Sequence, residues 1–221
     1  MTKQTFLEKL AELRATHCAK MPTPEMAVLT RATARLRRSG ILQACLQRGE
    51  TAPDFTFIDV NNDYQSLYGL LKTGPVVLNF FRGYWCIYCK TELAAYVSIR
   101  DELEATGVHY LAISPQKTDT AEQGVEHYHA LFDRNNQIAV QFGIAYSLGE
   151  DERKLFKSWN LMLDEVNQTS NWSLPLPAIY VIARDKTVAY QFTDVDIRSR
   201  CCPDELIEEL RHLVLINNKT H

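Results

Sequence analysis

Near the start of the chain, hydrophobic residues recur at helical spacing. A first helix is predicted because the following residues are three or four positions apart: Phe6, Leu10, Leu13 and His17. A second helix is predicted from Thr23 to Gly40. Thr23 followed by Pro24 is typical of a helix start, and Gly40 can end the helix. A short third helix is expected over residues 42–47. We interpret these helices as a packing or dimerisation element, with a ligand site as the alternative.

Beyond residue 50 the pattern changes to short apolar runs that alternate with helical segments. Strands are predicted over residues 53–63, 74–81, 108–114, 130–133, 178–183 and 187–192. Helical segments are predicted over residues 66–72, 90–107, 119–130, 135–144 and 203–216. This alternation predicts an α/β domain at residues 49–221, with a mostly parallel sheet covered by helices, after a helical N-terminal extension at residues 1–48.

Composition narrows the classes of partner. The chain has 221 residues, of which 46% are hydrophobic, and 24 basic and 27 acidic residues give a net charge of −3. No basic stripe for nucleic acid is visible. The longest apolar runs are far shorter than the ~20 residues that cross a bilayer, and charges interrupt the first residues, where a signal peptide is apolar. We therefore expect a cytoplasmic protein that binds neither nucleic acid nor membrane.

Two of the six cysteines, Cys86 and Cys89, are three positions apart and follow an apolar strand. In a reducing compartment such a pair is more typical of redox chemistry or metal binding than of a structural disulfide. A zinc site would need two more ligands, and the candidate pairs are remote, namely His127 with His129 and Cys201 with Cys202. We expect a redox pair with no metal and no cofactor, with two inert core cysteines as the alternative. Of the others, we expect packing roles for Cys18 and Cys45 and unpaired thiols at Cys201 and Cys202.

Cys86 falls at the junction of a predicted strand and the helix that follows it. Unpaired backbone N–H groups and the helix dipole stabilise a thiolate at such a junction. Arg82 and Lys90 could add positive potential, while Glu92 opposes it. Cys89 lies one turn further along the same helical face. The spacing thus predicts a nucleophile, Cys86, and its resolving partner, Cys89, within one turn.

Three segments, VVLNFFRGYWCIYCKTEL, LAISPQ and LPLPAIYVIARD, together resemble the peroxiredoxin-like proteins of the alkyl hydroperoxide reductase and thiol-specific antioxidant (AhpC/TSA) superfamily. The resemblance covers roughly residues 49–215 and implies a thioredoxin-like fold, with a mixed central sheet flanked by helices. It implies a thiol-dependent enzyme that reduces a peroxide or a disulfide, with Cys86 attacking and Cys89 resolving. It further implies an electron donor of the thioredoxin, glutaredoxin or small-thiol type. It also implies that Pro177 is a cis-proline. A homodimer is a further expectation.

The chain departs from the family pattern at functional positions. Gly83 stands where peroxiredoxins place a threonine or serine, Pro177 where they place an arginine, and Asn79 where thioredoxins keep a buried acid. We therefore expect Arg82 to activate the peroxide. The alternative interpretation is that Arg82 is a solvated charge on a loop. A protein disulfide reductase or isomerase, or a non-catalytic redox sensor, stays open as an alternative function.

Aromatic residues surround the cysteine pair in the sequence. Tyr84, Trp85, Tyr88 and Pro177 are predicted to form an exposed apolar rim around Cys86 that docks a substrate or a reducing protein. For Trp85 a place in the core is the alternative.

Overall fold

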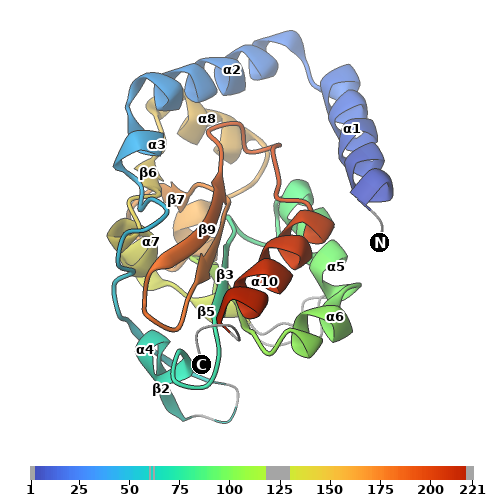
Figure 1. Ribbon diagram of the computed structural model, residues 1–221. Helices are drawn as coiled ribbons and strands as arrows, with labels where there is room; N and C mark the ends of the chain where they lie inside the picture. The colour runs from blue at the N-terminus through green and yellow to red at the C-terminus, as the bar shows by residue number, and fades with distance from the viewer. Residues whose placement is uncertain (1–2, 60, 62, 118–129, 218–221) are drawn as a thin grey trace.

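The computed structural model describes residues 3–59, 61, 63–117 and 130–217 (Figure 1). Its first elements are the helices α1 (Lys3–Lys20), α2 (Thr23–Arg38) and α3 (Ile41–Ala44). The three predicted N-terminal helices are confirmed, although α2 begins at Thr23 itself and no side chain caps it. Gly40, with φ of +75°, separates α2 from α3 as expected. In Figure 1, α1 and α2 form a bent arm, in which α2 crosses the top of the α/β body and α1 runs down beside its right-hand side.

The central sheet has five strands in the order β5-β4-β3-β8-β9. Their bounds are β3 (Val76–Phe80), β4 (His109–Ser114), β5 (Ala130–Phe132), β8 (Ala178–Ile182) and β9 (Val188–Thr193). β3, β4 and β5 are parallel, whereas β8 is antiparallel to β3 and to β9. The expectation of a mostly parallel sheet is therefore wrong for β8, which is antiparallel to both of its neighbours. A tight turn through Asp185 and Lys186 joins β8 to β9 as a hairpin, which requires antiparallel pairing. The mixed sheet of a thioredoxin-like fold is confirmed.

The remaining elements surround this sheet. They are β1 (Thr56–Ile58), β2 (Tyr64–Ser66), α4 (Leu67–Leu70), α5 (Ile87–Val97), α6 (Arg100–Ala105), the 3-10 turn η1 (Arg134–Asn136), α7 (Gln137–Gln141), β6 (Ala145–Ser147), α8 (Glu150–Ser158), α9 (Leu163–Val166), β7 (Ser173–Pro175) and α10 (Pro203–Asn217). The sequence patterns missed β2, β6, α8, α9 and β7. The helix predicted over residues 90–107 is interrupted at Ile99 (φ −115°, ψ 17°), and most of the helix predicted over residues 119–130 lies outside the described residues.

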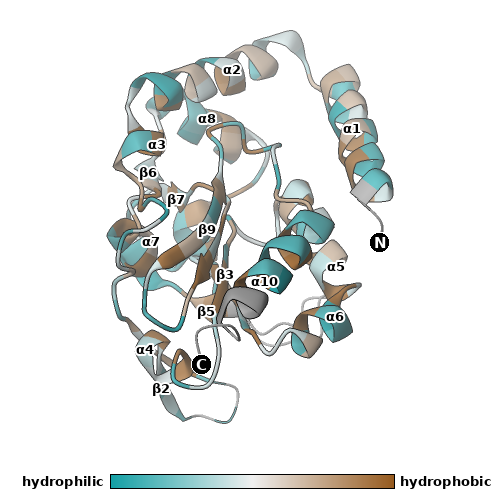
Figure 2. Cartoon of the chain, in the orientation of Figure 1, coloured by the Kyte–Doolittle hydropathy of each residue, from teal (hydrophilic) through white to brown (hydrophobic). Residues whose placement is uncertain are grey.

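Alternate residues of the central strands face two different helical layers. Val77 of β3 and Ile179 of β8 pack among side chains of α5, α6 and α10. Leu78, Phe80 and Tyr180 face the other way, into a core that includes residues of α7. Both strands are buried along their whole length, and Figure 2 shows hydrophobic colour concentrated on the central elements. Burial of both faces explains why these strands read as continuous apolar runs.

The helical arm lies over the end of β3 that precedes the cysteine pair. Phe6 and Leu10 of α1 are buried in one cluster with Phe81, Tyr84 and Tyr88. Helix α1 also contacts α5 and α10, and α2 contacts α8. The N-terminal helices thus pack onto the region of the domain where the sequence places its chemistry.

Candidate active site

Cys86 is the N-cap residue of α5, as the sequence predicted. Its backbone N–H donates to the carbonyl of Gly83 at 3.2 Å, and its own carbonyl accepts from the N–H of Lys90 at 3.0 Å. Both thiols of the pair are free, and Cys89 hydrogen-bonds to the sulfur of Cys86. Cys86 is 5% exposed and Cys89 is completely buried. The strand-to-helix junction therefore holds the two sulfurs close together, with Cys86 on the outer side.

The two thiols have opposite acid strengths. The pKa of Cys86 lies well below its usual value, because Cys89 donates a hydrogen bond to its sulfur and because Arg82 and Arg200 are nearby positive charges; burial opposes this. The pKa of Cys89 is raised well above its usual value, because the side chain is buried and its proton is engaged with Cys86. The pair is thus a thiolate at Cys86 beside a protonated Cys89. Lys90, a predicted contributor, is exposed on the surface.

Arg82 is buried beside the cysteine pair, which excludes the alternative of a solvated loop charge. The residue is 4% exposed, and its Cζ lies 4.8 Å from the centre of the Trp85 ring and 5.8 Å from that of Phe156. Its Nε has no hydrogen-bond partner among the described residues. Because a buried cation is costly without a compensating charge, the Cys86 thiolate is its natural counter-ion.

A second buried arginine, Arg200, was missed by the sequence analysis. Its Nη2 donates to Sγ of Cys89 at 3.5 Å, and its Nε lies 3.2 Å from Oε2 of Glu92, an ion pair without hydrogen-bond alignment. Burial raises the pKa of Glu92 to about 7, and the charge of Arg200 opposes this rise. Glu92 is thus a buried acid next to the resolving thiol, on α5, whereas Asn79 on β3 donates to the hydroxyl of Tyr110 at 2.7 Å. No spacing rule connects residue 200 to the cysteine pair, so the sequence carried no signal for it.

Gly83 is required by the backbone of the loop that leads to Cys86. Its φ is +144°, and an added Cβ would meet the indole of Trp85 and lie 2.8 Å from Oε1 of Gln116. The same Oε1 accepts the N–H of Tyr84 at 2.7 Å, which holds the loop in place. A threonine or serine therefore does not fit at position 83 in this loop, and the missing hydroxyl is a consequence of the local backbone.

The predicted exposed aromatic rim is wrong. Tyr84 and Tyr88 are 8% and 4% exposed, Pro177 is buried, and Trp85 is half-buried. For Tyr84 and Tyr88 the physical reason is α1, which shares one buried cluster with them and whose His17 packs edge-on against Tyr88 with ring centres 5.5 Å apart.

The expectation of a cis-proline at Pro177 is also wrong. The described residues contain no cis peptide bond. The trans bond fits the path of the chain, which runs from β7 directly into β8. Pro177 precedes Ala178, which pairs with Phe80 at the end of β3, so it lies at the sheet end that carries the cysteine loop.

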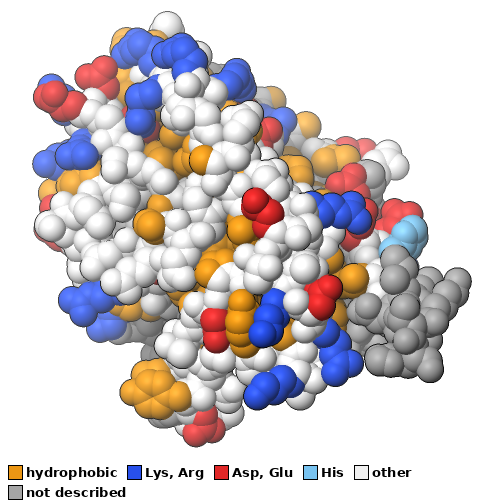
Figure 3. Space-filling model, turned by 60° about the vertical axis from the view of Figure 1, so that its left-hand side comes forward, with side chains coloured by type: hydrophobic (Ala, Val, Ile, Leu, Met, Phe, Trp, Pro, Cys, Tyr) orange, Lys and Arg blue, Asp and Glu red, His pale blue; other side chains and the backbone are white. Residues whose placement is uncertain are grey.

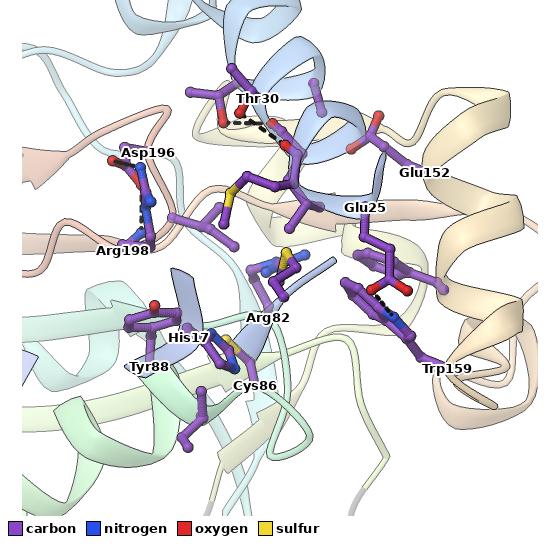
Figure 4. Close-up of a pocket in the computed structure, with 18 of the residues that line it drawn as sticks. His17, Glu25, Thr30, Arg82, Cys86, Tyr88, Glu152, Trp159, Asp196 and Arg198 are labelled. Atoms are coloured by element: carbon purple, nitrogen blue, oxygen red, sulfur yellow. Dashed lines mark hydrogen bonds and ion pairs between the residues drawn. The ribbon is translucent and has the colours of Figure 1, made fainter. Parts of the chain in front are cut away.

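A cavity of about 780 Å³ opens beside Cys86, with α2 opposite the cysteine loop (Figure 4). Cys86 and Arg82 lie together on its wall, close to His17 and Tyr88. The rest of its wall is largely apolar and includes Met21, Met26, Leu29, Trp85, Phe156, Trp159, Val195 and Ile197. Cys18, expected to be a packing residue, is instead exposed at this cavity, while Cys45 is buried. The arrangement offers a reactive thiolate and a buried cation to a molecule that enters the cavity.

Two negative findings concern the described residues alone. No group of three or more His, Cys, Asp or Glu side chains in this part of the chain is placed to hold a metal ion. None of its helices combines the length and the apolar character needed to span a membrane.

The fold and the cysteine pair define a thioredoxin-fold thiol oxidoreductase. The model of the AhpC/TSA family matches residues 48–191, and the chain belongs to this family. Membership confirms the resemblance noted in the sequence, and with it the class of thiol-dependent, peroxide-reducing enzymes.

Solved structures agree on the fold. Peroxidoxin BcpB from Mycobacterium tuberculosis is 21% identical, with a TM-score of 0.53 over 76% of this chain and 98% of that one. The mitochondrial 2-Cys peroxiredoxin of Plasmodium falciparum is 14% identical, with a TM-score of 0.56 over 79% and 98%. Peroxiredoxin 6 of Arenicola marina is 17% identical, with a TM-score of 0.60 over 78% and 75%. A search of curated proteins found no match.

Proposed function

We propose that this protein is a thiol peroxidase in which Cys86 attacks the peroxide and Cys89 resolves the product. The Cys86 thiolate forms a bond to one peroxide oxygen, the O–O bond breaks, and the departing oxygen leaves as an alcohol or water after protonation. The resulting sulfenic acid at Cys86 is attacked by Cys89, so that a disulfide forms and water leaves. A thiol donor then returns the two electrons that the peroxide has taken.

One observation carries this proposal: the Cys86 thiolate and the buried guanidinium of Arg82 lie on the wall of one cavity. Peroxide cleavage needs positive groups aimed at the charge that develops on the departing oxygen. Arg82 offers several donors and a permanent charge for this purpose, and backbone N–H groups at the start of α5 can add to it. Arg82 thereby takes over the activation that the family pattern assigns to a threonine or serine and an arginine, which are replaced here by Gly83 and Pro177.

The other sequence-based assignments are part of the same proposal. Residues 1–48 act as a helical extension of a thioredoxin-like domain at 49–221, and the enzyme works in the cytoplasm, with a homodimer as a further expectation. A protein disulfide reductase is disfavoured, because Cys86 is 5% exposed and lies below α1 and α2, where a disulfide on a folded protein does not reach it. The same burial disfavours a sensor that presents the pair to a partner surface.

The test is single-turnover oxidation of the reduced protein by hydrogen peroxide, followed through the intrinsic tryptophan fluorescence, to which Trp85 beside Cys86 contributes. We expect Arg82→Met to slow this step by ~10 to 1000 fold. Alkylation of Cys86 by iodoacetamide, measured in parallel, separates two roles of Arg82, because alkylation needs the thiolate but no polarisation of an O–O bond. We expect alkylation to slow much less than peroxide oxidation.

Arg38→Met is the matched control, because Arg38 is exposed on α2 away from the cavity. If the wild-type protein reacts with peroxide no faster than a free thiolate at the same pH, the peroxidase function is refuted. Equal slowing of alkylation and peroxide oxidation in Arg82→Met would assign Arg82 to thiolate stabilisation alone.

A further inference from the structure

Access to the Cys86–Cys89 pair leads through the cavity. Cys89 is completely buried, so an incoming thiol can reach only the sulfur of Cys86. The cavity holds about 780 Å³, within the range of roughly 300–1,000 Å³ that encloses small-molecule ligands. Hydrogen peroxide needs only a small part of this space, since a water molecule takes about 30 Å³ in the liquid. The remaining volume has room for a second, larger reactant.

The roof of the cavity is held in place by buried side chains of the helical arm. Phe6 and Leu10 of α1 are 0% and 3% exposed, and Leu36 of α2 is 4% exposed. These contacts place the end of α1 and the whole inner face of α2 over Cys86. A folded donor protein would have to displace both helices before its cysteine reached Cys86.

Two of the three acidic groups on the cavity wall are ion-paired, and the third, Glu25, keeps its negative charge. Glu25 accepts the indole N–H of Trp159 at 2.9 Å, Glu152 pairs with Arg35 at 2.7 Å, and the remaining acid, Asp196, pairs with Arg198.

Three cations on the same wall are left over. Lys20, Arg37 and Arg82 form no ion pair with any residue that the structure describes. Figure 3 shows Lys and Arg side chains gathered at the end of the molecule where α2 lies. These three cations outnumber the one unpaired acid, Glu25, and the Cys86 thiolate that balances Arg82 in the reduced protein is gone once the disulfide has formed. The cavity of the oxidised protein therefore carries a net positive charge.

We propose that the electron donor is a low-molecular-weight thiol bearing carboxylates, of the cysteinyl-peptide class, which enters this cavity. The proposal rests on the proposed function, because it names the molecule that reduces the disulfide formed by the peroxide reaction. The apolar wall accommodates the carbon chain of such a thiol, and Arg37 and Lys20 attract its carboxylates.

The reduction proceeds by two thiol–disulfide exchanges. The donor thiolate forms a bond to the sulfur of Cys86, the Cys86–Cys89 bond breaks, and Cys89 leaves as a thiolate beside Arg200, 3.5 Å away, and takes up a proton. A second donor thiolate attacks the donor sulfur of this mixed disulfide and releases the Cys86 thiolate. Two donor thiols are oxidised to one disulfide, and the protein is reduced by two electrons.

The test uses the full-length protein with its disulfide preformed by diamide and purified. Its reduction is followed by Trp85 fluorescence and mass spectrometry with four donors, which are glutathione, 2-mercaptoethanol, cysteamine and thioredoxin with its reductase. Each small-thiol rate is divided by the thiolate concentration and by the rate of the same thiol with hydroxyethyl disulfide. We expect the anionic glutathione to exceed the cationic cysteamine by ~10 fold or more, and the advantage to shrink in 1 M salt.

Thioredoxin, at a concentration that rapidly reduces insulin, should leave the disulfide intact. Rapid reduction by thioredoxin, or equal normalised rates for glutathione and cysteamine, would overturn the proposal.

A charge reversal on α2 locates the effect. Arg37→Glu should reduce the normalised advantage of glutathione by ~3 to 10 fold, because Arg37 lines the cavity. Arg38→Glu, the same change one residue along at a position outside the cavity, should leave it unchanged. Equal effects of the two variants would mean that overall charge, and not the cavity, selects the donor.

The outcome is separable from that of the proposed function. Because the disulfide is made with diamide, its reduction by glutathione is measured whether or not peroxide oxidises Cys86. A protein that is inert to peroxide but selectively reduced by glutathione would refute the peroxidase function and support the donor site. A protein that reacts rapidly with peroxide but shows no preference for glutathione would support the peroxidase function and refute the donor site.

Discussion

Glu92 predicts an unusual dependence of stability on pH. Its folded pKa of about 7 and its ordinary value of 4.5 differ by about 2.5, which at ~1.4 kcal/mol for each pKa unit corresponds to about 3 kcal/mol. Between these two values the unfolded chain has already released the proton that the folded protein still holds. The contribution of Glu92 to the free energy of unfolding should therefore be fully present below pH 4.5 and be lost, by about 3 kcal/mol, as the pH rises through 7.

The assay compares urea unfolding of the wild type and Glu92→Gln between pH 4 and 9 under reducing conditions. The variant also loses the ion-pair partner of Arg200, which changes its free energy of unfolding at every pH. The diagnostic quantity is therefore how the difference in free energy of unfolding between wild type and variant changes with pH. Because the other titrating groups are shared, the advantage of the wild type over the variant should decline by about 3 kcal/mol with a midpoint between pH 4.5 and 7. The control is Glu208→Gln, at an exposed position on α10 with no ion pair among the described residues, which should give a flat difference. A flat difference for Glu92→Gln as well would refute the reasoning.

Two further predictions concern the cysteine loop. Gly83→Ala should lower the free energy of unfolding by ~1–3 kcal/mol in chemical denaturation, because residue 83 has a φ of +144° and an added Cβ would meet Trp85. An unchanged denaturation midpoint would show that the loop shifts freely. Iodoacetamide at pH 6 should modify Cys86 before the other thiols, while at pH 9 the exposed Cys18 should compete for the reagent. Peptide mapping identifies the modified thiol, and modification of Cys18 first at pH 6 would contradict a thiolate at Cys86.

Much of the fold could be predicted because its core strands are buried on both faces. The runs that became β3 and β8 read as continuous apolar segments between Gly or Pro and polar turns, and this signal is local. The strands β6 and β7 are only three residues long and pair with each other, so neither run is long enough to show a period. Helix α8 is short too, although Gly149 followed by three acidic residues is a start signal that was overlooked.

The candidate site was predictable only in its local part. Cys86, Cys89 and the helix start come from adjacent positions, and the strand-to-helix junction follows from the same stretch of sequence. Arg200 approaches Cys89 from 111 positions away, and the burial of Tyr88 depends on α1. Such contacts arise from packing between elements that are distant in the sequence, and residue types and spacing do not encode them.

The geometry of the dithiol also fixes the order of its reactions. One hydrogen bond, from Cys89 to the sulfur of Cys86, lowers the pKa of the outer thiol and raises that of the inner one. When Cys86 is oxidised to a sulfenic acid, the negative charge on its sulfur is gone, and the positive charge of Arg200 then favours ionisation of Cys89. Cys89 thus becomes a nucleophile only after Cys86 has reacted. The thiol that the cavity reaches attacks first, and the thiol that it does not reach completes the disulfide.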